Sequence, residues 1–452
     1  MNPATEQITF IQSATPALPA GEYKMKVEET FLVSLEHFCK YLPDSEGKSS
    51  LHLPDGTTHI RLLTYRHWQF SVNLQSEAFQ SIMSHVNRTP SGQQTPSSLQ
   101  FPFDGPPPTP SQVQMALSHQ AQGALSDEDA QVLVHNAFTM GYVPLNHHLR
   151  QAGQTVSWYR GPLVPYAVGL TLTVPISGPD AANRYNPETG LFDVSYGAAW
   201  QLGQLLALQN KSFATALYRW KQRVQQHTAV AAEHKVLTEK LQGIEAFAEV
   251  FAQRQTSLET QPPPVPDEVV SWLVRLRLLY GVPFNYWVPD DRMLPPESLQ
   301  FFHLDLNWLD ALVDGAFSIG RATTGDLHRD APHLHSVHRQ ALSAMRHVRS
   351  HRAPAAEDDT GVKAVTGFLL RSQVVAGWPG LNVKGYVDAQ GETELPKLRL
   401  SHISKDILLG LFDGVINMVR FQVPPEQLHT EVEGQKSHYT TTLREFALRC
   451  SL

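Results

Sequence analysis

The sequence predicts an α+β protein, in which a β-rich N-terminal part precedes long central helices and a C-terminal domain with a duplicated strand–helix unit. Three patterns carry this prediction. Apolar and polar residues alternate near the N-terminus, apolar residues recur at helical intervals in residues 197–254, and the segment 299–321 returns at residues 398–420. Alternation with a period of two is typical of a strand with one buried face, whereas recurrence every three or four residues is typical of a helix.

The sequence of residues 1–295 predicts three regions. Residues 1–86 favour antiparallel strands, because Trp68, Phe70, Val72 and Leu74 alternate with polar residues. Residues 87–125 are rich in Pro, Ser, Gln and Gly, which predicts a linker or surface arm. Residues 126–295 predict a mixed domain with a short helix, bent strands, long helices up to about residue 254 and a further helix that begins near residue 267.

Residues 299–321 and 398–420 are two copies of one segment, which predicts a pseudo-symmetric pair within a domain spanning residues 296–452. In each copy a strand-like stretch meets a residue suited to an N-cap, Asp305 or Ser404, and one apolar stripe at helical spacing follows. A His/Arg-rich insertion, residues 322–360, separates the copies. The identical pairs are Leu299/Leu398, His303/His402, Leu309/Leu408, Leu312/Leu411, Asp314/Asp413, Gly315/Gly414 and Arg321/Arg420.

Three repeat-equivalent pairs have candidate roles. Gly315 and Gly414 lie off the apolar stripe, where glycine costs about 1 kcal/mol relative to alanine, so we expect them to admit a neighbouring backbone. Asp314 and Asp413 would form a carboxylate pair for acid–base chemistry if the copies faced each other; polar exposure and a hydrogen bond to a helix terminus are the alternatives. His303 and His402 predict a hydrogen bond to a neighbouring backbone.

Composition restricts the classes of function. Charged residues make up 17% of the 452 residues, below the roughly 25% usual for globular domains. A low-charge surface favours a component of an assembly, although a general composition bias explains it equally well. The net charge of −7 argues against a general nucleic-acid binder. Two distant cysteines, with no signal-peptide pattern and no long apolar run, predict a cytoplasmic protein without a membrane partner.

The insertion contains the one group of residues with the potential to bind a metal. Asp330, His333, His335 and His338 include an H-x-H-x2-H pattern whose imidazoles could share zinc. The pattern superficially resembles the H-x-H-x-D-H motif of metallo-β-lactamase-like hydrolases, but Val337 stands where that family has aspartate. An exposed structural segment is the alternative. The basic residues that could contact an anionic partner from the same insertion are Arg339, Arg346 and Arg349.

Two aromatic clusters flanked by Gly and Pro could anchor a protein interface. Their alternative role is ordinary core packing. The sequence shows no P-loop, G-x-G-x-x-G, G-x-S-x-G or H-E-x-x-H pattern, which removes the commonest nucleotide-binding and hydrolase classes. The clusters comprise Trp158, Tyr159 and Arg160, and Tyr286 and Trp287.

Five segments resemble a family of large, uncharacterised bacterial proteins that are similar to proteins encoded near phage-tail-like contractile injection systems. The resemblance implies a structural or accessory role in a multi-protein assembly, without cofactor or catalytic motif, in which the partners are other proteins. The oligomeric state stays open, and a metal-dependent hydrolase at residues 328–338 is the alternative. The segments are residues 15–23, Phe192–Gly203, Phe301–Asp305, Ala311–Gly315 and Gly377–Gly380.

Overall fold

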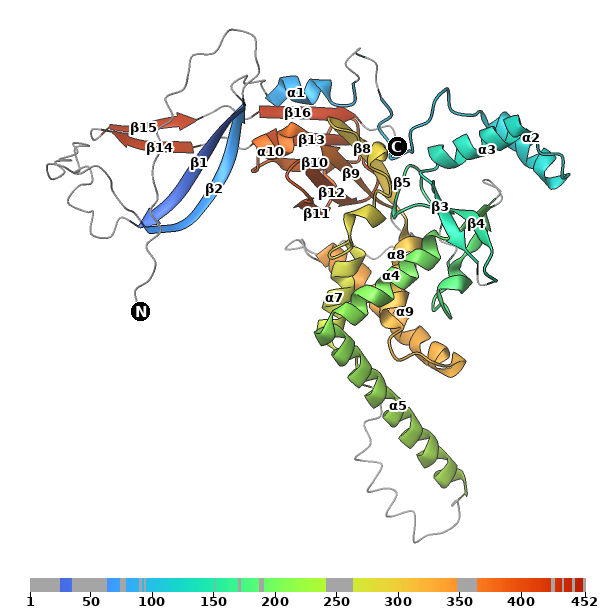
Figure 1. The fold of residues 1–452 in the computed structure, drawn as a ribbon. Coiled ribbons are helices and arrows are strands. Elements are labelled where there is room, and N and C mark those ends of the chain that lie inside the picture. The colour runs from blue at the N-terminus through green and yellow to red at the C-terminus, as the bar shows by residue number, and fades with distance from the viewer. Residues whose placement is uncertain are drawn as a thin grey trace, which may run out of the picture. The chain divides into compact units, whose positions relative to one another are not determined.

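The computed structural model confirms the α+β class (Figure 1). Its contacts divide the chain into two units, residues 1–84 with 422–445 and residues 85–421 with 446–452. The structure describes residues 25–34, 63–73, 79–88, 92, 95–149, 151–169, 172–186, 191–240, 263–347, 364–423, 427–432, 435–440 and 444–449.

The first unit contains two antiparallel strand pairs. Strands β1 (Met25–Ser34) and β2 (Leu63–Asn73) pair along their whole length, with a register shift between Leu32 and Val33. The alternating residues from Trp68 to Val72 lie in β2, as the period of two predicts. Strands β14 (Gln427–Val432) and β15 (Gln435–Thr440) form the other pair. The sequence boundary between the units, residues 84 and 85, falls at the end of helix α1 (Phe79–His85).

A five-stranded antiparallel sheet forms the centre of the second unit, in the order β11-β12-β9-β8-β5. Its inner strands are almost entirely buried, so their continuous apolar runs are those of a sheet covered on both faces. A three-stranded sheet has the order β10-β13-β16. The strands are β5 (Leu163–Val164), β8 (Ser298–Leu304), β9 (Val365–Arg371), β11 (Lys397–His402), β12 (Ile407–Asp413), β10 (Asn382–Tyr386), β13 (Met418–Val423) and β16 (Arg444–Arg449), and α10 (Gln373–Gly377) follows β9.

Two of the helices that pack beside this sheet cross with closely approaching backbones. A Cβ atom on Gly203 would lie 1.9 Å from the Leu312 carbonyl oxygen, and one on Gly315 would lie 1.9 Å from the Trp200 carbonyl oxygen. The close approach expected at Gly315 is therefore confirmed. The helices are α4 (Ser195–Gln209), α5 (Lys211–Lys240), α7 (Asp267–Arg277), α8 (Leu306–Phe317) and α9 (Thr324–His347).

A second group of elements covers residues 110–193. Helices α2 (Pro110–Ala121) and α3 (Asp127–Thr139) precede the four-stranded sheet β3-β4-β7-β6, in which only the β4–β7 pair is parallel. The linker expected over 87–125 thus contains α2, whose start has the capping box of Thr109 and Gln112. The strands are β3 (Val143–His148), β4 (Gln154–Tyr159), β6 (Arg184–Asn186) and β7 (Leu191–Asp193); single 3-10 turns are η2 (Pro179–Ala182), η3 (Phe284–Tyr286) and η4 (Asp291–Met293).

The second copy of the repeat corrects the expected duplication. Asp305 caps α8 by accepting hydrogen bonds from the backbone N–H groups of Asn307 and Trp308, so the first copy is a strand followed by a helix. The second copy forms strands β11 and β12, and residues 407–413 are not a helix. Their run Ile-Leu-Leu-Gly-Leu-Phe has no polar position at helical spacing and suits a buried central strand. The duplication therefore extends to the first strand of each copy but not to the helix that follows it.

Elements on both sides of residue 295 share the core of the second unit. Strand β5 pairs with β8, and α4 packs along α8. One cluster of buried side chains includes Trp200, Trp220, Trp308 and Leu409. The sequence predicts separate domains over residues 126–295 and 296–452, whereas residues 126–295 and the part of 296–452 up to residue 421 belong to one packed unit.

Candidate functional site

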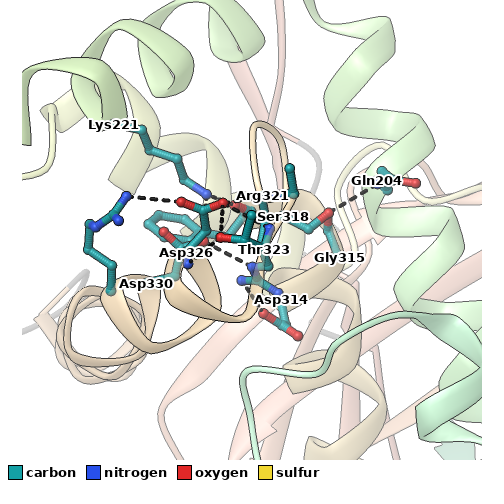
Figure 2. Close-up of polar contacts among 12 residues, drawn as sticks. Gln204, Lys221, Asp314, Gly315, Ser318, Arg321, Thr323, Asp326 and Asp330 are labelled. Carbon is teal, nitrogen blue, oxygen red and sulfur yellow. Dashed lines mark hydrogen bonds and ion pairs between the residues drawn. The ribbon is translucent and has the colours of Figure 1, made fainter. Parts of the chain in front are cut away.

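Four charged side chains form a buried cluster where α5, α8 and α9 meet (Figure 2). Arg321 follows α8 and joins two carboxylates: its Nη2 lies 2.9 Å from Asp314 Oδ1, and its Nε lies 3.0 Å from Asp330 Oδ2. Lys221 Nζ on α5 lies 2.6 Å from the same Asp330 oxygen. Two cations therefore balance two anions, which is the condition for retaining charges in a protein interior.

The cluster also satisfies backbone and indole groups around it. Asp314 Oδ2 accepts hydrogen bonds from the Ile176 N–H at 2.6 Å and from Trp200 Nε1 at 3.1 Å. Arg321 Nη1 donates to the Ile176 carbonyl at 3.0 Å, and Lys221 Nζ donates to the Phe317 carbonyl at 2.5 Å. The charges therefore fix the loop around residue 176 and helices α4, α5, α8 and α9 to one another.

Burial changes the proton affinity of two members of the cluster. It raises the pKa of Asp314 above the usual carboxyl value, against the opposing charge of Arg321. It lowers the pKa of Lys221 to about 8, against the opposing charge of Asp330. The pKa of Lys221 therefore lies closer to neutral pH than that of an exposed lysine.

A cavity of about 110 Å³ opens beside Lys221 and Asp330. Arg329 and His333 on α9 are among its lining residues. The His333 ring meets Trp220 edge-on, 4.9 Å between centroids, and burial lowers the pKa of His333. A space of this size holds a few water molecules or a very small ligand.

The structure corrects the expected metal site. Its four residues lie on helix α9, where His333 and His335 are about 200° apart around the axis because a helix has 3.6 residues per turn. Asp330 is engaged by Lys221 and Arg321, and His335 is exposed. Among the residues that the structure describes, no three His, Cys, Asp or Glu side chains are grouped for a metal. The side chains of His338, Arg339 and Arg346, and residue Arg349, lie outside the described set.

The first aromatic cluster is core and not surface. Trp158, Tyr159 and Arg160 are each at most 4% exposed, which overturns their expected role as interface anchors. The guanidinium of Arg160 lies 3.2 Å from Asp305 Oδ2, and the same carboxylate oxygen accepts from Tyr196 at 3.1 Å. Arg160 therefore links β4 to the N-cap of α8.

The second aromatic cluster is also tied to the interior. Trp287 is buried, and the half-buried Tyr286 accepts a hydrogen bond at its carbonyl from the Tyr159 hydroxyl at 2.9 Å. Core packing, the alternative that the sequence left open for these residues, is what their burial shows.

The repeat-equivalent residues do not form one site. His303 is buried in β8, where burial lowers its pKa, whereas His402 is exposed in β11. Asp314 is fully buried and bonded to Arg321, whereas Asp413 is half-buried at the end of β12. Gly414 has φ +128° next to β12 and lies in no helix. The expected carboxylate pair does not form, because the second copy has no counterpart of α8.

An apolar groove, which sequence analysis missed, opens where α4 ends, α5 begins and α7 ends. It encloses about 420 Å³, and Trp272 and Tyr280 are its aromatic residues. On α4 next to it, Leu205 and Leu208 lie about one turn apart and are 53% and 56% exposed. These leucines break the amphipathic pattern, and that was the available signal in the sequence. The groove residues are Leu206, Gln209, Asn210, Lys211, Trp272, Leu276, Tyr280 and Gly281.

Comparisons with known proteins add no family to these observations: no family model, curated protein or solved structure matches the chain. In the part of the chain that is described, no helix is both long enough and apolar enough to cross a membrane.

Proposed function

We propose that this protein is a non-enzymatic structural or interaction component of a multi-protein bacterial assembly, with a contractile injection particle as the candidate assembly. The groove between α4, α5 and α7 carries the proposal. Its volume falls within the range of protein ligand sites, roughly 300–1,000 Å³. Exposed large apolar residues grouped beside a concave surface are typical of protein-binding sites.

The buried charges support the same proposal. Asp314, Arg321 and Asp330 are bonded to one another and to neighbouring groups, so their role is to hold helices together. A catalytic site needs a group that is free to contact a substrate. The groove supplies accessible surface, whereas this cluster supplies rigidity.

The experiment is gentle isolation of the tagged protein from its native host, followed by mass spectrometry and light scattering. We expect a large particle that contains sheath, tube or baseplate-like proteins. The substitution Gln209→Trp, at an exposed groove position, should fill the groove and lower recovery of the particle about tenfold. The matched control is Gln114→Trp on exposed α2, which should leave recovery unchanged. A monomer or small oligomer from the wild-type isolate would contradict the proposal.

A further inference from the structure

Two guanidinium groups stack on Tyr280, one of the residues that line the groove. The Arg275 and Arg399 guanidinium carbons lie 5.5 and 4.0 Å from the centre of the Tyr280 ring. Lys211 lines the groove itself. Cations stacked on an aromatic face are held in place, and their charge remains available to a further anion.

These cations lack carboxylate partners within the described residues. Ion pairs of this unit include those of Lys221, Arg277 and Arg321 with aspartates, and among the described residues none involves Lys211, Arg275 or Arg399. Arg399 is 8% exposed and donates to the Leu278 carbonyl and the Ser401 hydroxyl. Burial lowers its pKa, and no carboxylate opposes that effect. Its guanidinium carbon also lies 5.4 Å from the centre of the Trp287 ring, so Arg399 is held by hydrogen bonds and aromatic contacts and adds positive charge behind Tyr280.

No carboxylate lines the groove. The acid on the neighbouring turn of α7, Glu268, accepts a hydrogen bond from Ser212 and is absent from the groove wall. The groove therefore combines apolar side chains with one lining cation, Lys211, and with two guanidinium groups that stack on Tyr280. A polyanion such as nucleic acid does not fit this surface, because the whole chain has a net charge of −7 and a single cation, Lys211, is among the residues that line the groove.

We propose that the groove binds a segment of a partner protein in which a large apolar side chain lies next to a carboxylate, with that carboxylate facing the exposed cations Lys211 and Arg275. The apolar side chain packs against Trp272 and Leu276 at the groove wall. Opposite charges at the rim set the orientation of the segment, and apolar burial supplies most of the affinity. This inference rests on the proposed function, because it names the chemistry of the partner at the same groove.

The test uses the full chain and a display library of random peptides of about twelve residues. We expect the enriched peptides to combine aromatic or leucine residues with Asp or Glu. The strongest binder is then synthesised with a fluorescent label, and its dissociation constant is measured by anisotropy. Raising the ionic strength from about 0.05 to about 0.5 M should weaken binding, since salt screens exposed charges.

Charge-reversal variants provide the decisive comparison. Lys211→Glu with Arg275→Glu should weaken binding of the peptide at least about tenfold, equivalent to about 1.4 kcal/mol. Lys240→Glu is the matched control, because it lies on the same helix roughly 43 Å from Lys211 at 1.5 Å per residue and is also exposed. It should leave affinity unchanged, and circular dichroism should show all variants folded.

The outcomes separate this inference from the proposed function. Enriched peptides without carboxylates, no enrichment, or unchanged binding to the double variant would each overturn the acidic partner. If Gln209→Trp nevertheless abolishes recovery of the native particle, the assembly role stands and only the partner chemistry fails. If Gln209→Trp does not weaken peptide binding, the groove is not the binding site and the inference fails.

Discussion

Asp314 is the most deeply buried member of the charge cluster. Its carboxylate is fully buried and joins Arg321, the Ile176 N–H and Trp200 Nε1. Replacing it with asparagine leaves an unbalanced positive charge in the interior, so we expect Asp314→Asn to lower the free energy of unfolding by about 3 kcal/mol or more. Urea unfolding followed by circular dichroism measures this change.

The repeat supplies the matched control for that variant. Asp413 is identical to Asp314 in the sequence alignment of the copies, but it is half-buried and has no ion pair in the described structure. Asp413→Asn should change the free energy of unfolding by about 0.5 kcal/mol or less. If both variants lowered the free energy of unfolding equally, the burial of Asp314 would not be the reason for its contribution to stability. Sequence identity alone could not distinguish the two aspartates, because burial depends on the helix that only the first copy forms.

At the level of elements, the crossing of α4 and α8 depends on glycine. A Cβ atom at position 203 would lie 1.9 Å from a backbone oxygen, so the helices must separate to admit it. We expect Gly203→Ala to lower the free energy of unfolding by about 2 kcal/mol or more, because overpacking outweighs the gain of about 1 kcal/mol in helix propensity. Thermal and urea unfolding measure the loss.

The same substitution in α9 should have the opposite sign. Gly325 lies in the first turn, is exposed, and has 3.6 Å between its ideal Cβ position and the nearest neighbour, Thr323 Oγ1. Gly325→Ala should therefore be neutral or stabilise the protein by up to about 1 kcal/mol. Destabilisation by both variants would contradict the assignment of the Gly203 effect to the helix crossing.

The two copies of the repeat show where sequence patterns were sufficient to predict secondary structure and where they were not. Asp305 followed by apolar residues at helical spacing predicted α8, and the structure has that cap and that helix. The prediction of a helix in the second copy was wrong, because a short, continuous apolar run fits a buried strand as well as a buried helix. Gly410 lies against Phe368 on the neighbouring strand, a contact that only the sheet order reveals. Long-range pairing, and not local propensity, decided the outcome there.

The scale of the whole molecule explains why the candidate site was harder to predict than the fold class. Each partner in the buried cluster is distant in sequence: Lys221 and Asp314 lie on different helices, and Ile176 lies in a loop. The groove likewise combines the end of α4 with the end of α7. Period and composition predict elements, whereas both sites depend on the packing of segments that are distant in sequence. The expected metal site failed for the converse reason, because closeness in sequence on α9 did not bring its residues to one face.

The pH dependence of unfolding is a property of the whole molecule, because every titrating group contributes to it. The pKa of Lys221 is about 8 in the folded protein and 10.5 in a model peptide, so the unfolded chain binds more protons between these values. Stability should therefore rise with pH in this window as the cost of burying the ammonium is lost. Above about pH 10 the buried tyrosines Tyr142 and Tyr196, whose pKa values burial raises, act in the opposite direction.

A comparison with Lys221→Met isolates the contribution of the lysine from that of all other groups. Between pH 8 and pH 10 the free energy of unfolding of the wild type should rise relative to that of the variant by about 2 kcal/mol, given 1.36 kcal/mol per pKa unit. Urea unfolding at several pH values measures both proteins. Lys211→Met, at the exposed start of the same helix, should keep the wild-type profile. Parallel profiles for wild type and Lys221→Met would mean that Lys221 stays fully charged in the folded protein, and the cluster would then be a permanent ionic clamp with no proton exchange near neutral pH.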